Sequence, residues 1–154
     1  MNRVWAYIIS KPLPEQQLQE LTTSGNNFVA GWTAHENKLS AEIKILYNRI
    51  ILINVHENVH NASGCSIDKL TRFIKDTEAK FNIELLNRFL VAYQVKDGVE
   101  IVHSSKIKDL LAQNIVTENT IVFNTAVANE AELQNWELKL KDTWLNKYLH
   151  KQDR

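Results

Sequence analysis

Short apolar runs separated by polar turns open the chain and predict strands. Residues 4–10 are apolar and aromatic and stop before Pro12, so we expect a first strand there. A short helix should follow from Pro14 and end near Gly25, because proline suits the first turn of a helix and glycine suits its end. Residues 28–34 are again apolar and predict a second strand.

The next two runs differ in how they distribute their apolar side chains. Residues 39–47 alternate, with apolar side chains on one face and Glu42 and Lys44 on the other, which predicts a strand with one solvated face after a hairpin turn at 36–37. Residues 50–55 are almost continuously apolar. A strand of that composition is covered on both faces, so we expect it at the centre of the protein.

The clearest helical pattern covers residues 66–81. Apolar side chains recur with the spacing of one helix face, and charged side chains of alternating sign lie four residues apart on another face. The apolar positions are Ile67, Leu70, Ile74 and Phe81, and the charged ones are Asp68, Arg72, Asp76 and Lys80.

The second half of the chain predicts a hairpin and then a mixture of helices and strands. Residues 85–95 and 99–103 flank the Asp-Gly pair at 97–98, which is typical of a tight hairpin turn. We expect a short helix over 105–114 and a strand over 120–124. A capping box formed by an asparagine and a glutamate three residues later predicts a final helix. Its residues are Asn129 and Glu132, with an apolar stripe at Leu133, Trp136, Leu140, Trp144 and Tyr148.

Hairpins mixed with helices predict an α+β protein with a largely antiparallel sheet of six or seven strands and helices packed on one side. The length of 154 residues, with 44% hydrophobic and 23% charged residues, is ordinary for one globular domain, which we expect to span 1–154.

Charge and cysteine content narrow the classes of partner and compartment. Eighteen Lys and Arg balance eighteen Asp and Glu, so no basic excess favours a nucleic acid or an anionic membrane. Cys65 is the one cysteine, which excludes an intrachain disulfide, and the apolar run at 4–9 is too short for a signal peptide. We therefore expect a cytoplasmic protein that binds neither nucleic acid nor membrane.

His56, Glu57 and His60 match the H-E-x-x-H pattern of zinc peptidases, in which two histidines one helical turn apart bind the metal and the glutamate activates water. That chemistry requires a helix, whereas the β-branched residues 50–55 that lead into the motif favour a strand. We therefore predict no metal and no cofactor, and a zinc-dependent hydrolase stays as an alternative.

A loop of small residues at 62–66 opens into the predicted helix, where free N–H groups and the helix dipole favour an anion. The same setting favours the thiolate of a cysteine. The residues of this candidate binding site are Ser63, Gly64, Cys65, Ser66 and Lys69, joined by Arg49 and Arg88, which each follow an asparagine beside an apolar strand. Capping and close packing of the helix end are the alternative interpretation.

The stretch ASGCSIDK at 62–69 resembles a family of small bacterial proteins of undetermined function, as do the earlier GWTAH and ILYNR segments and the later VFNTAV, which two tryptophans follow. Some members carry the label of an ABC-transporter ATPase. This chain has four glycines and no G-x-x-x-x-G-K-[ST] phosphate loop, which contradicts that label. The resemblance implies no activity and directs attention to the loop.

Together these patterns predict a cytoplasmic binding or regulatory domain that recognises a small anionic ligand or a protein partner at 62–69. Three alternatives stay open. They are a zinc hydrolase using His56, Glu57 and His60, a thiol-dependent enzyme using Cys65, and a structural homo-oligomer.

Overall fold

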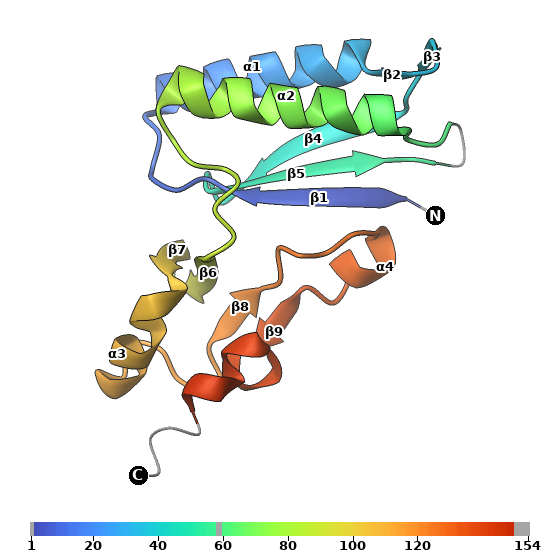
Figure 1. Ribbon diagram of the computed structural model, residues 1–154. Coiled ribbons are helices and arrows are strands. Elements are labelled where there is room, and N and C mark those ends of the chain that lie inside the picture. Colours follow the sequence, from blue (N-terminus) through green and yellow to red (C-terminus); the bar gives the residue numbers. More distant parts are fainter. Residues whose placement is uncertain (1, 58–59, 150–154) are drawn as a thin grey trace.

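The structure, a computed structural model, describes residues 2–57 and 60–149 of the chain. Two groups of elements follow one another along the sequence (Figure 1). The first group is β1 (Arg3–Ile8), α1 (Glu15–Gly31), β2 (Thr33–Ala34), β3 (Asn37–Lys38), β4 (Ala41–Leu46), β5 (Ile50–Val55) and α2 (Gly64–Phe81). The second is β6 (Leu90–Val95), β7 (Gly98–His103), η1 (Ser104–Lys106), α3 (Ile107–Ala112), β8 (Ile121–Phe123), α4 (Glu130–Leu133), β9 (Glu137–Lys139), η2 (Leu140–Asp142) and η3 (Trp144–Tyr148).

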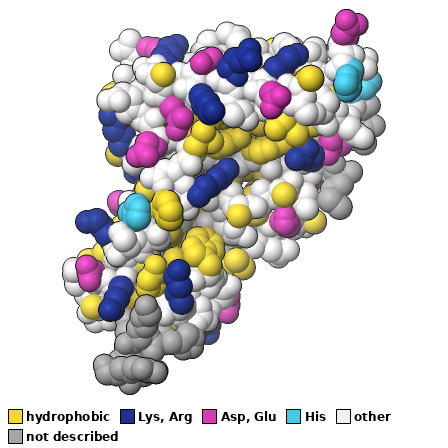
Figure 2. Space-filling view, in the orientation of Figure 1, with side chains coloured by type: hydrophobic (Ala, Val, Ile, Leu, Met, Phe, Trp, Pro, Cys, Tyr) yellow, Lys and Arg dark blue, Asp and Glu magenta, His cyan; other side chains and the backbone are white. Residues whose placement is uncertain are grey.

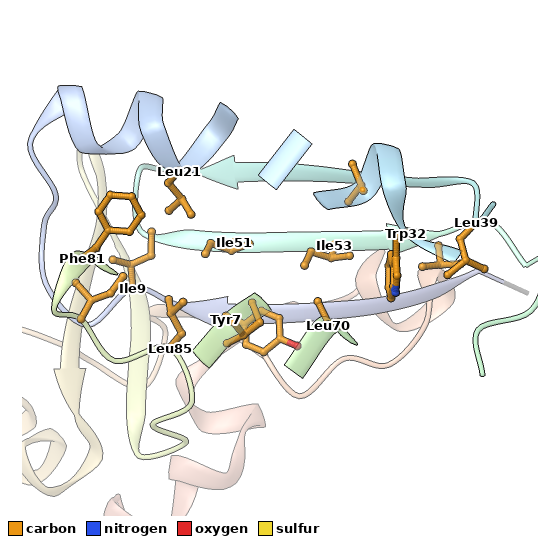
Figure 3. Packing of buried hydrophobic residues seen from close by; sticks show 14 of the residues in the cluster. Tyr7, Ile9, Leu21, Trp32, Leu39, Ile51, Ile53, Leu70, Phe81 and Leu85 are labelled. Atoms are coloured by element: carbon orange, nitrogen blue, oxygen red, sulfur yellow. The ribbon is translucent and has the colours of Figure 1, made fainter. Parts of the chain in front are cut away.

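The central sheet has the antiparallel order β1-β5-β4, and α1 and α2 lie side by side over one of its faces (Figure 1). Because side chains alternate between the faces of a strand, the odd-numbered residues of β5 point toward the helices. Figure 3 shows Ile51 and Ile53 there, packed with Leu21 of α1 and Leu70 of α2. Every residue of β5 is buried, which confirms the prediction of a central strand covered on both faces.

A second antiparallel sheet, in the order β7-β6-β8-β9, packs on the other face of the central sheet. Ile50 and Leu52 of β5 contact this layer through a cluster that includes Ala92 and Phe123. The opposite face of the second sheet packs against α3 and the C-terminal turns through a further cluster. Its fully buried members are Ile107, Val122, Leu140 and Leu145. The chain therefore stacks helices, sheet, sheet and helical turns.

The predicted single sheet of six or seven strands is wrong, because the strands form three sheets of three, two and four strands. Helices also lie on both outer sides rather than on one. The apolar pattern of β5 is the same whether helices or another sheet cover its second face. Sequence periodicity reports burial, and it cannot distinguish a strand beside β5 from a strand stacked above it.

The predicted helix end near Gly25 and the predicted strand over residues 28–34 are both wrong in part, because α1 continues through Gly31 and only Thr33–Ala34 form a strand, β2. Tertiary packing explains the longer helix: the Phe28 ring stacks on Phe73 of α2 at 4.5 Å between centroids, and Val29 is buried in the core. The 66–81 prediction is confirmed, since α2 spans Gly64–Phe81.

The predicted final helix is wrong beyond Leu133. Asn129 does cap a helix start by accepting from the Glu132 N–H at 2.9 Å, but α4 ends at Leu133. The chain then pairs with β8 as β9 and continues as short 3₁₀ turns. Trp136 packs edge-on against Phe123, whereas Trp144 is 49% exposed, so the aromatic stripe serves two different environments.

No helix among the described residues has both the length and the apolar character that crossing a membrane would need.

Candidate functional site

The predicted loop builds a reciprocal capping box at the start of α2. The N–H of Ser66 donates to Ser63 Oγ at 3.2 Å, and the N–H of Ser63 donates to Ser66 Oγ at 2.7 Å. Ser66 is fully buried, and its carbonyl oxygen accepts from Trp32 Nε1 at 2.8 Å. Both hydroxyls therefore cap the start of α2, and the buried Ser66 anchors it to Trp32.

The other residues of that loop face outward. Gly64, Cys65 and Lys69 are exposed, and Lys69 Nζ donates to Thr33 Oγ1 at 3.1 Å. The first two turns of α2 thus present a thiol and an ammonium group to solvent.

Arg49 lies away from this loop. It immediately precedes β5, whereas α2 starts beyond the other end of that strand (Figure 1). Its Nε and Nη2 donate to the Ile9 carbonyl oxygen at 3.2 and 3.1 Å. Burial lowers the pKa of Arg49, and the charge of Glu100 opposes that shift. Arg49 closes the turn-side end of the central sheet and does not converge with Ser63 or Lys69.

Arg88 lies at the free edge of β1. Its Nη1 donates to the Ala6 carbonyl oxygen at 3.3 Å, and its guanidinium carbon is 5.7 Å from the centre of the Tyr7 ring. Burial raises the pKa of Tyr7 to about 12, with the positive charge of Arg88 acting in the opposite direction. The Arg88 side chain thus lies across the edge of β1, where its guanidinium group donates to the backbone and lies near the ring of Tyr7.

Among the residues that the structure describes, partners on the same edge of β1 pair with the strand only at its start. The N–H of Val4 donates to the Ala128 carbonyl at 3.0 Å, and the N–H of Glu130 donates to the Asn2 carbonyl at 3.2 Å. The ladder would next use the Ala128 N–H, but that group donates to Glu132 Oε1 at 3.0 Å. The chain before Ala128 therefore separates from β1.

A cavity of about 510 Å³ opens where the two segments separate. Its walls come from β1, from Arg88 in the segment that leads into β6, from β6, from the loop after β8 and from η3. The residues that line it are Arg3, Val4, Trp5, Ala6, Arg88, Leu90, Asn124, Thr125, Ala126, Val127, Ala128 and Trp144. Figure 2 shows hydrophobic side chains that reach the surface in a band beneath the two long helices, with Lys and Arg side chains beside the band.

Two guanidinium groups and few competing charges define the electrostatics of this cavity. The Arg3 guanidinium carbon lies 4.9 Å from the centre of the Trp5 ring. Among residues 2–57 and 60–149, no carboxylate oxygen is within 4.0 Å of a nitrogen of Arg3 or Arg88. Both cations are thus available to an anion that enters the cavity.

Comparison with protein-family models, with curated proteins and with solved structures finds no match to this chain. The bacterial family proposed from ASGCSIDK therefore stays a prediction.

The H-E-x-x-H segment lies partly outside the described residues, since Asn58 and Val59 are not described. His56 is not in a helix, and its Nδ1 lies 2.9 Å from Asn2 Nδ2. Glu57 Oε2 accepts from the Ala62 N–H at 2.9 Å. Within the described part of the chain, no group of three or more His, Cys, Asp or Glu side chains is placed to hold a metal ion.

Of the seven residues assigned from sequence, Arg88 is the one that lines the cavity. Sequence reasoning missed Arg3 and Trp144, which are far apart in the sequence and line the same cavity in the folded chain. The VFNTAV segment, which includes Asn124 and Thr125, was singled out by the family resemblance alone.

Proposed function

We propose that this chain is a cytoplasmic ligand-binding protein whose cavity beside β1 takes a small organic anion, a carboxylate or phosphate carried on an apolar or aromatic body. The observation that carries the proposal is that Arg3 and Arg88 both line one cavity while no described carboxylate lies within 4.0 Å of either.

Arg88 is prepared for this role by its contact with the backbone. The hydrogen bond from Nη1 to Ala6 uses one of five guanidinium N–H groups and fixes the plane of the side chain. The remaining donors can bind a carboxylate or phosphate through parallel hydrogen bonds, which are stronger than neutral ones. Fixing the cation before binding lowers the entropy lost when the ligand arrives.

The backbone of β1 adds a donor to the same wall. In an antiparallel strand both backbone groups of one residue point to the same side. Since the Val4 N–H and the Ala6 carbonyl both have partners on the free edge, the Ala6 N–H is directed to that edge too. Glu132 opposes an anion near Ala128, so we place the anionic group toward Ala6 and Arg88.

The size and the apolar part of the cavity indicate the rest of the ligand. A volume of about 510 Å³ is in the range of small-molecule sites. Leu90 and Val127 supply apolar wall, and Trp144, 49% exposed, offers an indole face to a planar group. An inorganic ion would leave most of this surface uncovered.

Three probes separate the charge from the ring. Benzoate has both, benzamide has about the same size and the ring without the charge, and the smaller acetate has the charge without the ring. Calorimetric titration of the full chain should rank benzoate tightest, at about millimolar affinity, roughly 4 kcal/mol. Arg88→Gln should remove the preference for benzoate over benzamide, and Trp144→Ala should remove its preference over acetate.

Arg72→Gln is the matched control, because Arg72 is exposed on α2 and does not line the cavity. It should leave all three affinities unchanged. Equal binding of benzoate and benzamide to the wild type, or equal loss in Arg72→Gln and Arg88→Gln, would contradict the proposal.

A further inference from the structure

β4 is an edge strand of the central sheet with nothing paired to its outer side among the described residues. It pairs with β5, and the order β1-β5-β4 leaves its other edge open. Its sequence, Ala41–Leu46, holds no proline or glycine, the residues that commonly interrupt such an edge. Edges of this kind are templates for pairing with another strand.

The direction of each backbone group on β4 follows from one hydrogen bond. The N–H of His56 donates to the Ser40 carbonyl at 2.8 Å, so even-numbered residues of this segment bond toward β5. The N–H and C=O groups of Ala41, Ile43 and Ile45 are therefore directed to the open edge.

The charges on β4 select how a second copy of the same strand would pair. If the two-fold axis passes beside Ile43, then Ile43 faces its own copy, Ala41 faces Ile45, and Glu42 faces Lys44, twice by symmetry. If the two-fold axis instead passes beside residue 42, Glu42 faces Glu42 of the second copy. If it passes beside residue 44, Lys44 faces Lys44. Opposite charges thus meet in one register, and like charges meet in its two neighbours.

Burial on the two faces agrees with this pairing. Ile43 and Ile45 are half-buried on the helix side, where a groove of about 420 Å³ runs beside Leu18 and Thr22 of α1. A paired strand would extend the apolar layer under α1 in both copies. On the other face the Glu42 side chain lies 3.9 Å from His56 Nε2. Because it is still 49% exposed, it can also be reached by Lys44 of a second copy.

We propose that two copies of this chain associate antiparallel through β4, joining the three strands of each central sheet into one continuous sheet. The partner is a second copy because the charge pattern of β4 is complementary to itself in one of the registers that its open backbone groups allow. This pairing is independent of the ligand site, which lies at the opposite edge strand, β1.

Sedimentation of the full chain over a concentration series tests the pairing. The wild type should change from one copy to two as concentration rises. Glu42→Lys and Lys44→Glu should each weaken the dimer about tenfold or more, because each replaces two attractive cross-strand pairs by two repulsive pairs. The double variant, Glu42→Lys with Lys44→Glu, should restore it.

Asp76→Lys makes the same change of charge as Glu42→Lys at an exposed site on α2 and should leave the dimer intact. A wild-type chain that stays a single copy at every concentration overturns the proposal. So does a dimer that both single variants leave unchanged, or one that the double variant fails to restore.

Discussion

Arg88 reaches across 82 positions of sequence to donate from its Nη1 to the carbonyl oxygen of Ala6. This hydrogen bond joins the segment before β6 of the second sheet to the edge of β1 in the central sheet. It places a cation at the wall of the cavity. The site therefore depends on how the two sheets stack, rather than on any local motif.

The capping box of α2 predicts a stability effect. Ser63→Ala removes the acceptor for the Ser66 N–H and should lower the free energy of unfolding by about 1 kcal/mol. Urea denaturation measures the change. Thr71→Ala is the control, since its exposed hydroxyl bonds a carbonyl inside the same helix and its loss should be nearly neutral. Equal effects of the two substitutions would show that the box contributes nothing beyond a surface hydroxyl.

Gly25 sets how closely α1 approaches β4. A Cβ added there would lie 2.7 Å from Ile43 Cδ1, so Ile43 would have to shift, whereas a Cβ at Gly31 meets nothing within 4 Å. Alanine raises helix propensity at either site by up to about 1 kcal/mol. Thermal unfolding should therefore find Gly31→Ala more stable than Gly25→Ala by about 1 kcal/mol or more. A stabilised Gly25→Ala would contradict the tight contact.

Tyr7 predicts a loss of stability at alkaline pH. Burial, opposed by Arg88, raises its pKa to about 12, above the ordinary value of 10.0, so the unfolded chain loses this proton first. The stabilising contribution is complete below pH 10 and disappears as pH rises through about 12. In that window wild-type stability should fall more steeply than that of Tyr7→Phe, by about 1.4 kcal/mol per pH unit. If the free energy of unfolding falls with pH equally in the two proteins, Tyr7 has the same pKa in the folded and the unfolded chain, and the prediction is wrong.

The sequence predicts best where local pattern and final environment agree. Residues 50–55 are apolar because both faces of β5 are covered, and α2 has an apolar stripe together with its own cap. Within the predicted strand at 28–34, residues 28–31 were misassigned, because Phe28 and Val29 are good strand formers that tertiary contacts hold in α1, whereas Thr33 and Ala34 do form a strand. The stacking of two sheets leaves no periodic trace that differs from a single wider sheet.

The candidate site was predicted only in part for a related reason. Ser63 and Ser66 carry a local signal for capping a helix, which was the alternative interpretation of this loop, and the structure shows them joined in a capping box. Arg3 and Trp144 carry none, because each is an isolated residue whose partners come from distant segments. Arg88 was selected for its place beside a strand, although its backbone acceptor, Ala6, could not be anticipated.

The most direct test of the ligand site is a map of backbone amide NMR shifts during titration with benzoate. The account predicts saturable shifts at Val4–Ala6, around Arg88 and at residues 124–128, with Arg88→Gln abolishing them. Saturable shifts confined to residues 63–69 would instead place the anion at the start of α2, and the absence of saturable shifts would contradict an anion site in this protein.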